Sequence, residues 1–261
     1  MTENGFGGKV AVVTGAAGGI GAAVARRLAA GGAVVAALDV DAERLSTLTG
    51  KLSADGAAGR PYAVDVGDST AVDEALEQIE RDLGPVGVLA NVAGVLRSGP
   101  VTELDDATWA EVMRVNLDGV LHCSRAAARS MVPRREGAIV TVASNAGSVA
   151  RSALAAYSAS KAAAAAFTKC LGLELAPHGI RCNVVSPGST NTTMLGALLS
   201  EGDAVSNAVA GSLENYRNRI PLNRVAEPED IADVVAFMAS EHARHLTMQE
   251  LIVDGGATLR L

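Results

Sequence analysis

Short apolar runs alternate with longer helical patterns along almost the whole chain. The runs have the length of strands, and their apolar residues follow one another with little polar alternation. Strands of this kind are buried on both faces, as in a parallel sheet that helices cover. The seven predicted strands are Val10–Thr14, Val34–Leu38, Tyr62–Val66, Val86–Asn91, Ala138–Ser144, Arg181–Ser186 and Glu250–Asp254.

Strands that alternate with helices in this way predict the α/β class, as one doubly wound Rossmann domain with a seven-stranded parallel sheet. No linker, repeat or low-complexity segment divides the chain, so the domain is expected to cover residues 1–261. One stretch departs from the rhythm. Residues from Ser189 to about Arg219 are polar, contain glycine and lack a clear period, which predicts a mobile loop at the substrate.

The composition narrows the class of partner. Hydrophobic residues make up 49% of the 261 residues and charged residues 20%, which is typical of a folded globular protein. A net charge of −7 argues against nucleic acid or an anionic membrane as the main partner. No apolar run is long enough for a membrane span, and the three cysteines lack metal-site spacing. We therefore expect a cytoplasmic protein with reduced thiols and no metal.

A glycine-rich turn, "VTGAAGGIG", follows the first predicted strand and begins a helix. Gly15, Gly19 and Gly21 let the backbone turn tightly and approach a pyrophosphate, which the positive end of the helix attracts. Asp39 ends the second strand, and a carboxylate there can accept hydrogen bonds from ribose hydroxyls and repel a 2′-phosphate. No arginine follows it and Gly18 is not basic, so the sequence favours NAD over NADP. The alternative is that Asp39 only caps a turn.

The stretch "AAYSASKAAAAAF" places Tyr157 and Lys161 four residues apart on a predicted helix, and therefore on one face. One interpretation is an exposed helix with a solvated lysine. The other is a catalytic pair, because oxidation of an alcohol releases a proton that a base must accept. An ammonium about 4 Å from a phenol contributes about 4 kcal/mol at an effective dielectric near 20. On this interpretation Lys161 lowers the pKa of Tyr157.

In this order, "TGAAGGIG", "NVAG", "VN", Ser144, "YSASK" and "SPG" make the sequence similar to the short-chain dehydrogenase/reductase family over essentially its whole length. The resemblance implies that Tyr157 accepts the proton, Lys161 assists it, Ser144 orients the substrate oxygen and Asn116 supports a proton-relay water. It also implies NAD contacts beyond those of the glycine-rich turn and Asp39. These contacts are Ile20, Asp65, Val66, Asn91, Ala93, Gly94, Tyr157, Lys161, Pro187, Gly188, Thr190 and Thr192.

Within the family, "GVLRSG", "FTKCLGLELAPHGIRCNVVSPGST" and "HLTMQELIVDGGATL" resemble the members that oxidise 2,3-dihydro-2,3-dihydroxybenzoate to the aromatic catechol in siderophore synthesis. Such a substrate carries a carboxylate, so a pocket arginine is expected, with Arg97 preferred over Arg151. Ser144 and Met194 complete the implied substrate contacts. The loop after Met194 lacks a tryptophan, and Ala150 replaces a proline, so the amine analogue 2,3-dihydro-3-hydroxyanthranilate stays open.

Two other classes share this fold. A non-catalytic dinucleotide sensor has no use for the set of Asn116, Ser144, Tyr157 and Lys161. A ketoreductase that uses NADPH is disfavoured by Asp39. The resemblance also implies a homotetramer, for which the apolar C-terminal stretch "LIVDGGATLRL" is suitable interface material.

Overall fold

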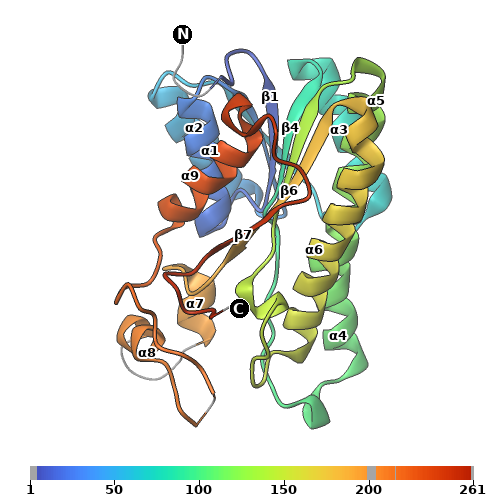
Figure 1. Cartoon of the computed structure of the whole chain (residues 1–261). Coiled ribbons are helices and arrows are strands. Elements are labelled where there is room, and N and C mark those ends of the chain that lie inside the picture. Colours follow the sequence, from blue (N-terminus) through green and yellow to red (C-terminus); the bar gives the residue numbers. More distant parts are fainter. Residues whose placement is uncertain (1–4, 199–203, 215, 260–261) are drawn as a thin grey trace.

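The computed structural model describes residues 5–198, 204–214 and 216–259. Within these ranges seven strands form one parallel sheet in the order β3-β2-β1-β4-β5-β6-β7, which confirms the predicted fold class (Figure 1). The strands are β1 (Val10–Thr14), β2 (Val34–Asp39), β3 (Gly59–Ala63), β4 (Val86–Asn91), β5 (Gly137–Val142), β6 (Ile180–Pro187) and β7 (Glu250–Val253).

Helices cover both faces of the sheet. On one face lie α1 (Gly19–Ala30), α2 (Ala42–Ala54) and α9 (Pro228–Ala239), and on the other α3 (Ser69–Leu83), α5 (Gly119–Arg134) and α6 (Ala155–Leu175) (Figure 1). Each layer encloses its own apolar core against the sheet. Shorter helices, α4 (Asp106–Met113), α7 (Thr193–Leu198) and α8 (Ala204–Ala210), lie beyond the ends of the strands.

The order of the strands reverses between β1 and β4. The chain builds outward from β1 through β2 to β3, then crosses to β4 on the other side of β1. Loops that follow β1 and β4 therefore leave the sheet in opposite directions. In such sheets a crevice opens at the carboxyl ends of these strands, and ligands bind there.

The third strand lies three residues earlier than predicted, at Gly59–Ala63 instead of Tyr62–Val66. It is an edge strand, and most of its residues are partly or fully exposed, so the apolar pattern is a poor guide to its limits. The chain turns just after it, because the carboxylate of Asp65 accepts a hydrogen bond from the Gly67 N–H at 2.8 Å. Asp65 thus belongs to a turn and not to a strand.

The predicted substrate loop 189–219 is less irregular than its sequence indicates. It holds α7 and α8, which pack Leu195 and Ala208 against Ile220, Val225 and Ala257. These helices are too short for a period to be read from the sequence. Residues 199–203 and 215 of the predicted loop lie outside the described residues, and its mobility stays a prediction.

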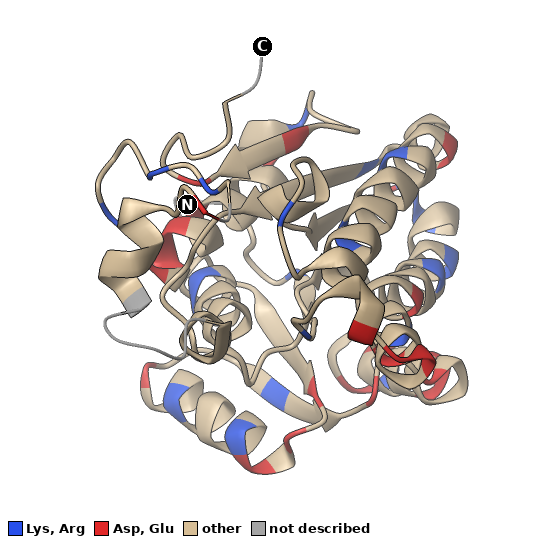
Figure 2. Cartoon of the chain, turned by 90° about the horizontal axis from the view of Figure 1, so that it is seen from below, with Lys and Arg blue, Asp and Glu red and all other residues tan. Residues whose placement is uncertain are grey.

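The surface mixes both signs of charge. Figure 2 looks onto the end of the molecule where α7 and α8 lie, and Lys and Arg alternate there with Asp and Glu around the periphery. Across the described ranges, the structure contains no helix with the length and apolar character that a membrane crossing requires.

Candidate active site

A cavity of about 560 Å³ opens at the carboxyl ends of the central strands. It collects most of the residues that the sequence singles out. Those that line it are Gly15, Gly19, Ile20, Gly21, Asp39, Asp65, Val66, Ala93, Gly94, Ser144, Arg151, Tyr157, Lys161, Pro187, Gly188, Thr190, Thr192 and Met194. Three predicted residues, Asn91, Arg97 and Asn116, do not line it.

The glycine-rich turn has no room for side chains. Gly15 has a φ of +65°, and a Cβ on it would lie 2.7 Å from the Cα of Ala93. A Cβ on Gly21 would lie 2.0 Å from the carbonyl oxygen of Gly15. Helix α1 then begins at Gly19 with no side-chain cap and no acidic residue in its first turn. The positive end of this helix therefore suits a phosphate, and the turn fits a dinucleotide.

Asp39 is held at the end of β2 by the backbone. Its Oδ2 accepts a hydrogen bond from the Ala17 N–H at 3.1 Å, and its Oδ1 accepts one from the Asp41 N–H at 3.1 Å. The Asp39 side chain therefore supports a local turn, as the alternative interpretation supposes. Asp39 also lines the cavity. The cap of α2 is Asp41, whose side chain accepts from Arg44 N–H. The two backbone hydrogen bonds thus fix the orientation of the Asp39 carboxylate at the edge of the cavity.

Sequence reasoning missed Arg114, which lines the cavity beside Asp65. Its Nη1 donates to the Asp65 carboxylate at 2.7 Å. Burial opposes ionisation of Asp65, but the Gly67 N–H and the Arg114 guanidinium outweigh it and hold the pKa of Asp65 below its usual value. The two residues are far apart in the sequence, so no local pattern could have paired them.

Tyr157 and Lys161 lie on α6 and are both buried, with exposed fractions of 9% and 4%. The exposed-helix interpretation is therefore wrong. Ser144 follows β5, and its hydroxyl lies close enough to Tyr157 to lower the pKa of the phenol. The Nζ of Lys161 donates to the Val142 carbonyl at 2.9 Å and lies 5.9 Å from the centre of the Tyr157 ring. A buried phenol, a hydroxyl and a buried ammonium therefore line the same cavity.

The expected direction of the Tyr157 pKa is wrong for the protein alone. Burial raises the pKa of Tyr157, and the neighbouring Ser144 hydroxyl only partly offsets this. The ammonium is directed at Val142 and lies farther from the phenol than the sequence argument assumed. Burial also lowers the pKa of Lys161 to about 8, which leaves it mostly protonated at neutral pH. A further positive charge in the cavity would lower the pKa of the phenol.

The two predicted asparagines, Asn116 and Asn91, do not line the cavity but form hydrogen bonds within the protein. Asn116 is fully buried in a π-helical turn, Arg114–Asp118, and its amide both accepts from Val95 N–H and donates to Val95 C=O. It thereby fixes the backbone that follows Gly94, and π-helical turns often mark functional sites. Asn91 donates to Ser124 at 2.9 Å. The structure thus places both amides in supporting positions and not on the cavity surface.

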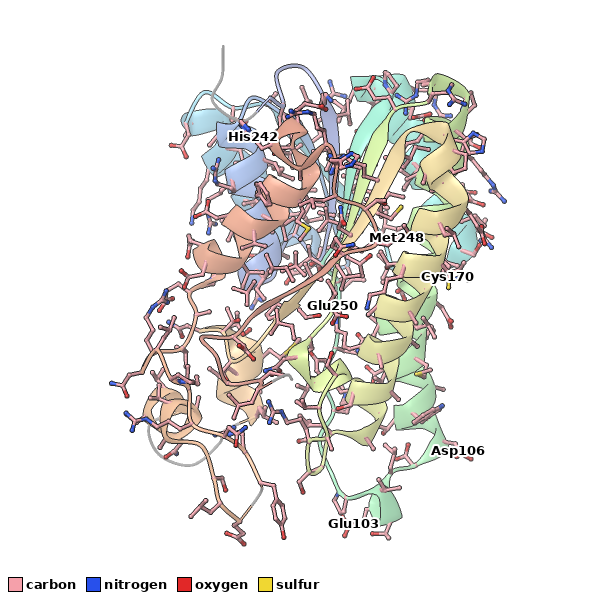
Figure 3. The ribbon with its side chains drawn as sticks, viewed as in Figure 1. Glu103, Asp106, Cys170, His242, Met248 and Glu250 are labelled. Atoms are coloured by element: carbon pink, nitrogen blue, oxygen red, sulfur yellow. The ribbon has the colours of Figure 1, made fainter. Side chains whose placement is uncertain are left out.

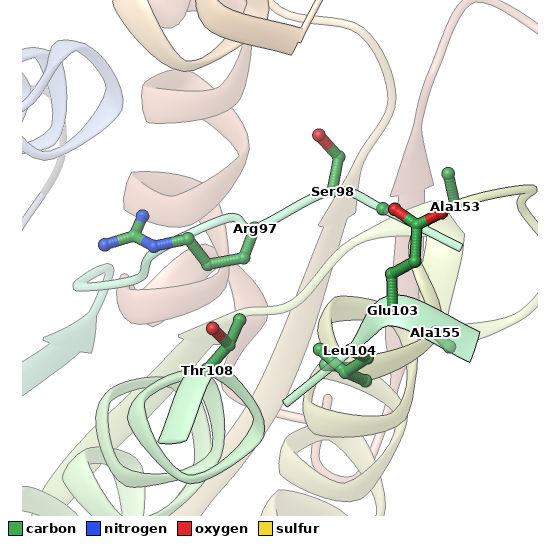
Figure 4. A pocket seen from close by; sticks show the side chains of 9 residues that line it. Arg97, Ser98, Glu103, Leu104, Thr108, Ala153 and Ala155 are labelled. Carbon is green, nitrogen blue, oxygen red and sulfur yellow. The ribbon is translucent and has the colours of Figure 1, made fainter. Parts of the chain in front are cut away.

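Arg97 lies outside this cavity, which corrects its choice as the carboxylate partner. Its Nη2 donates to Glu111 at 2.6 Å, so its charge is already paired. It borders a separate hollow of about 160 Å³ near Glu103 and Ala153 (Figure 4). Arg151 does line the main cavity, and so does Arg217, which sequence reasoning missed because its stretch shows no period.

Comparison with known proteins agrees with this geometry. The family model described as short chain dehydrogenase matches residues 9–202. The chain is 50% identical to 2,3-dihydro-2,3-dihydroxybenzoate dehydrogenase of Bacillus subtilis, over 99% of each chain. It is 39% identical to the vibriobactin-specific 2,3-dihydro-2,3-dihydroxybenzoate dehydrogenase of Vibrio cholerae, over 95% of each.

Among solved structures, a gluconate 5-dehydrogenase from Burkholderia cenocepacia, in complex with NADP and tartrate, superposes with a TM-score of 0.90. It is 31% identical and the match covers 98% of each chain. Sequence, fold and the contents of the cavity thus lead to one assignment. The chain belongs to the short-chain dehydrogenase family.

Proposed function

We propose that this protein oxidises a ring hydroxyl of 2,3-dihydro-2,3-dihydroxybenzoate with NAD and so forms the aromatic 2,3-dihydroxybenzoate for siderophore synthesis. The observation that carries the proposal is the cavity itself, in which the buried Tyr157 and Ser144 share one space with Arg151. The hydroxyl groups of Tyr157 and Ser144 can hydrogen-bond with an alcohol, and the Arg151 guanidinium can pair with a carboxylate. The full-length similarity to dehydrogenases named for this substrate supports the choice of acid.

In this mechanism the Ser144 hydroxyl holds the substrate hydroxyl against Tyr157, and the phenolate oxygen of Tyr157 accepts its proton. Lys161 keeps a positive charge beside the phenol. A nicotinamide held beside Ala93 and Gly94 would supply the acceptor for the hydride that leaves the carbon bearing this hydroxyl. Loss of that hydride and that proton leaves a ring ketone, and transfer of a ring proton to its oxygen completes the catechol. Aromatisation makes this direction strongly favourable.

The proposed NAD contacts follow the length of the cavity. Gly15, Gly19, Ile20 and Gly21 would hold the pyrophosphate, and Asp39 the adenosine ribose. The remaining contacts divide between the two ends of the cofactor. Asp65 and Val66 would flank the adenine, Ala93 and Gly94 the nicotinamide, and Pro187, Gly188, Thr190 and Thr192 the carboxamide.

A substrate panel tests the proposal. With NAD in excess, 2,3-dihydro-2,3-dihydroxybenzoate is expected to give the highest kcat/KM, followed by its 2-amino analogue 2,3-dihydro-3-hydroxyanthranilate. Saturated cyclic alcohols and acyclic polyols are expected to react poorly. A higher kcat/KM for the amino acid would move the assignment to the anthranilate series. Preference for a non-aromatising alcohol would overturn it.

The cofactor preference is expected to depend on Asp39. We predict that kcat/KM with NAD exceeds that with NADP by roughly 100-fold, because a 2′-phosphate beside a fixed carboxylate costs several kcal/mol. Asp39→Asn keeps the side-chain shape and one amide oxygen but removes the charge, and should narrow this ratio sharply. Asp41→Asn is the matched control, since Asp41 caps α2 outside the cavity. Equal kcat/KM for both cofactors in the unmodified protein would contradict the prediction.

The protein is also proposed to act as a homotetramer in the cytoplasm. Exposed apolar residues on β7, α9 and α6 support assembly: Leu251, Phe237 and Leu173. Three free cysteines agree with a reducing compartment. Sedimentation equilibrium should give four times the chain mass at micromolar concentration, and a monomer across that range would contradict the assembly.

A further inference from the structure

The cavity carries more positive charge than its own carboxylates balance. Asp39 accepts two backbone N–H bonds. Asp65 pairs with Arg114 at 2.7 Å, and Glu111 pairs with Arg97 at 2.6 Å. Two of these three carboxylates are therefore paired with a guanidinium before a ligand arrives, and Asp39 keeps its negative charge. The positive charges in the described lining that no carboxylate pairs with are those of Arg151, Lys161 and Arg217.

Two of these charges are guanidiniums from different elements. Arg151 belongs to the loop before α6, and Arg217 follows α8. Across the ranges that the structure describes, neither forms a salt bridge. They are close enough to repel each other: burial lowers the pKa of Arg151, and the charge of Arg217 lowers it further, with Asp254 opposing. The Asp254 carboxylate is already held by Asn145 and the backbone N–H groups of Gly256 and Thr258.

The Arg217 guanidinium is anchored on one side and leaves most of its donors without a partner in the described residues. Its Nη2 donates to the Asn207 carbonyl at 2.7 Å, while its Nε is buried and has no hydrogen-bond partner. Its backbone exchanges two hydrogen bonds with Ser212, at 2.9 and 2.8 Å. Gly211 permits this turn, because its φ is +75° and a Cβ there would lie 2.5 Å from the Arg217 carbonyl oxygen. A buried N–H without an acceptor costs stability, and no carboxylate among the described residues pairs with this side chain, so the Arg217 charge is left for an anion in the cavity.

We propose that Arg217 and Arg151 together form an anion subsite that binds the carboxylate of the substrate. The subsite shares its cavity with Tyr157 and with the apolar side chains of Met194 and Leu195. A small ring can therefore contact apolar surface while its hydroxyl faces Tyr157 and its carboxylate faces the two arginines. The ligand class is a small cyclic carboxylate. This inference rests on the proposed function and assigns its specificity to a residue outside the catalytic group.

The direct test compares an acid with its carboxyl-free counterpart. Arg217→Met keeps much of the side-chain length but removes the donors and the charge. With 2,3-dihydro-2,3-dihydroxybenzoate we expect kcat/KM to fall about 30-fold or more, the range for loss of one partner from a desolvated charge pair. With the carboxyl-free dihydrodiol of the same ring we expect kcat/KM to stay unchanged. Arg217→Lys should recover part of the loss.

Arg219→Met is the matched control, because Arg219 is exposed, donates to Asn223 and does not line the cavity. A binding measurement without turnover accompanies the kinetics. Titration calorimetry of the complex with NADH measures the affinity for the product. Arg217→Met should weaken the binding of 2,3-dihydroxybenzoate by the same factor as kcat/KM falls, and should leave the binding of catechol unchanged. Thermal unfolding of each variant shows whether the fold is retained.

The outcomes separate the subsite from the reaction. Equal losses for the acid and the neutral diol, or no loss for either, would overturn the subsite while turnover of the acid by the unmodified protein leaves the proposed function standing. If the unmodified protein oxidises no dihydroaromatic acid, yet binds benzoates in a way that depends on Arg217, the reaction is wrong and the subsite is supported.

Discussion

Replacing Tyr157 with phenylalanine is expected to lower kcat by a factor of about 100 to 10,000, the usual contribution of a general base. The phenol is buried and lines the same cavity as Ser144. Phenylalanine keeps the ring and removes only the proton acceptor. We therefore expect NADH to bind with nearly unchanged affinity, which its fluorescence on binding can report.

Tyr62→Phe is the matched control for this variant. Tyr62 lies on the edge strand β3, where its hydroxyl donates to Asp82 at 3.2 Å, and it does not line the cavity. Its loss should leave kcat unchanged. Substantial turnover by Tyr157→Phe would mean that another group accepts the proton, and would remove the mechanism proposed here.

Replacing Lys161 with methionine is expected to impair both turnover and cofactor binding. The ammonium is buried, lies 5.9 Å from the centre of the Tyr157 ring, and a Cβ on Gly94 would lie 3.2 Å from it. A charge about 6 Å away at an effective dielectric near 20 contributes about 3 kcal/mol, which changes the phenolate population about 100-fold. Without that charge the pKa of Tyr157 rises, so its phenolate forms only at higher pH.

The pH profile of kcat measures this effect. Because oxidation needs the phenolate, kcat should rise with pH, and Lys161→Met should move this rise to higher pH. Lys169→Met is the matched control on the same helix. Lys169 pairs at 2.6 Å with Glu250 of β7, which Figure 3 labels, and neither residue lines the cavity. An unshifted profile in Lys161→Met would show that its ammonium does not act on the phenol.

The parts of the site that were predictable are those in which neighbours in sequence act together. The glycine-rich turn, Asp39 and the pair Tyr157–Lys161 each depend on one strand end or one helix face, and the apolar pattern locates both. The limits of β1 and β4 were correct for the same reason. Local spacing was sufficient there because the backbone alone brings those groups together.

The parts that were not predictable depend on contacts between distant segments. The sequence does not show that Glu111 of α4 lies 2.6 Å from the Arg97 guanidinium and already pairs with it. Arg217 sits in a stretch without a period and reaches the cavity only through its turn with Ser212. The pKa of Tyr157 was misjudged because burial, which a sequence does not quantify, exceeds the favourable contacts.

The central claim is that this cavity converts one dihydroaromatic acid into its aromatic product with NAD. The most direct measurement is the stoichiometry of a complete reaction, with limiting 2,3-dihydro-2,3-dihydroxybenzoate, excess NAD and the purified full-length protein. NADH is followed by its absorbance, and 2,3-dihydroxybenzoate is quantified by chromatography. We expect equal amounts of NADH and 2,3-dihydroxybenzoate, with the substrate consumed to completion because aromatisation drives the reaction. NADH without the aromatic acid, or no NADH from this substrate, would contradict it.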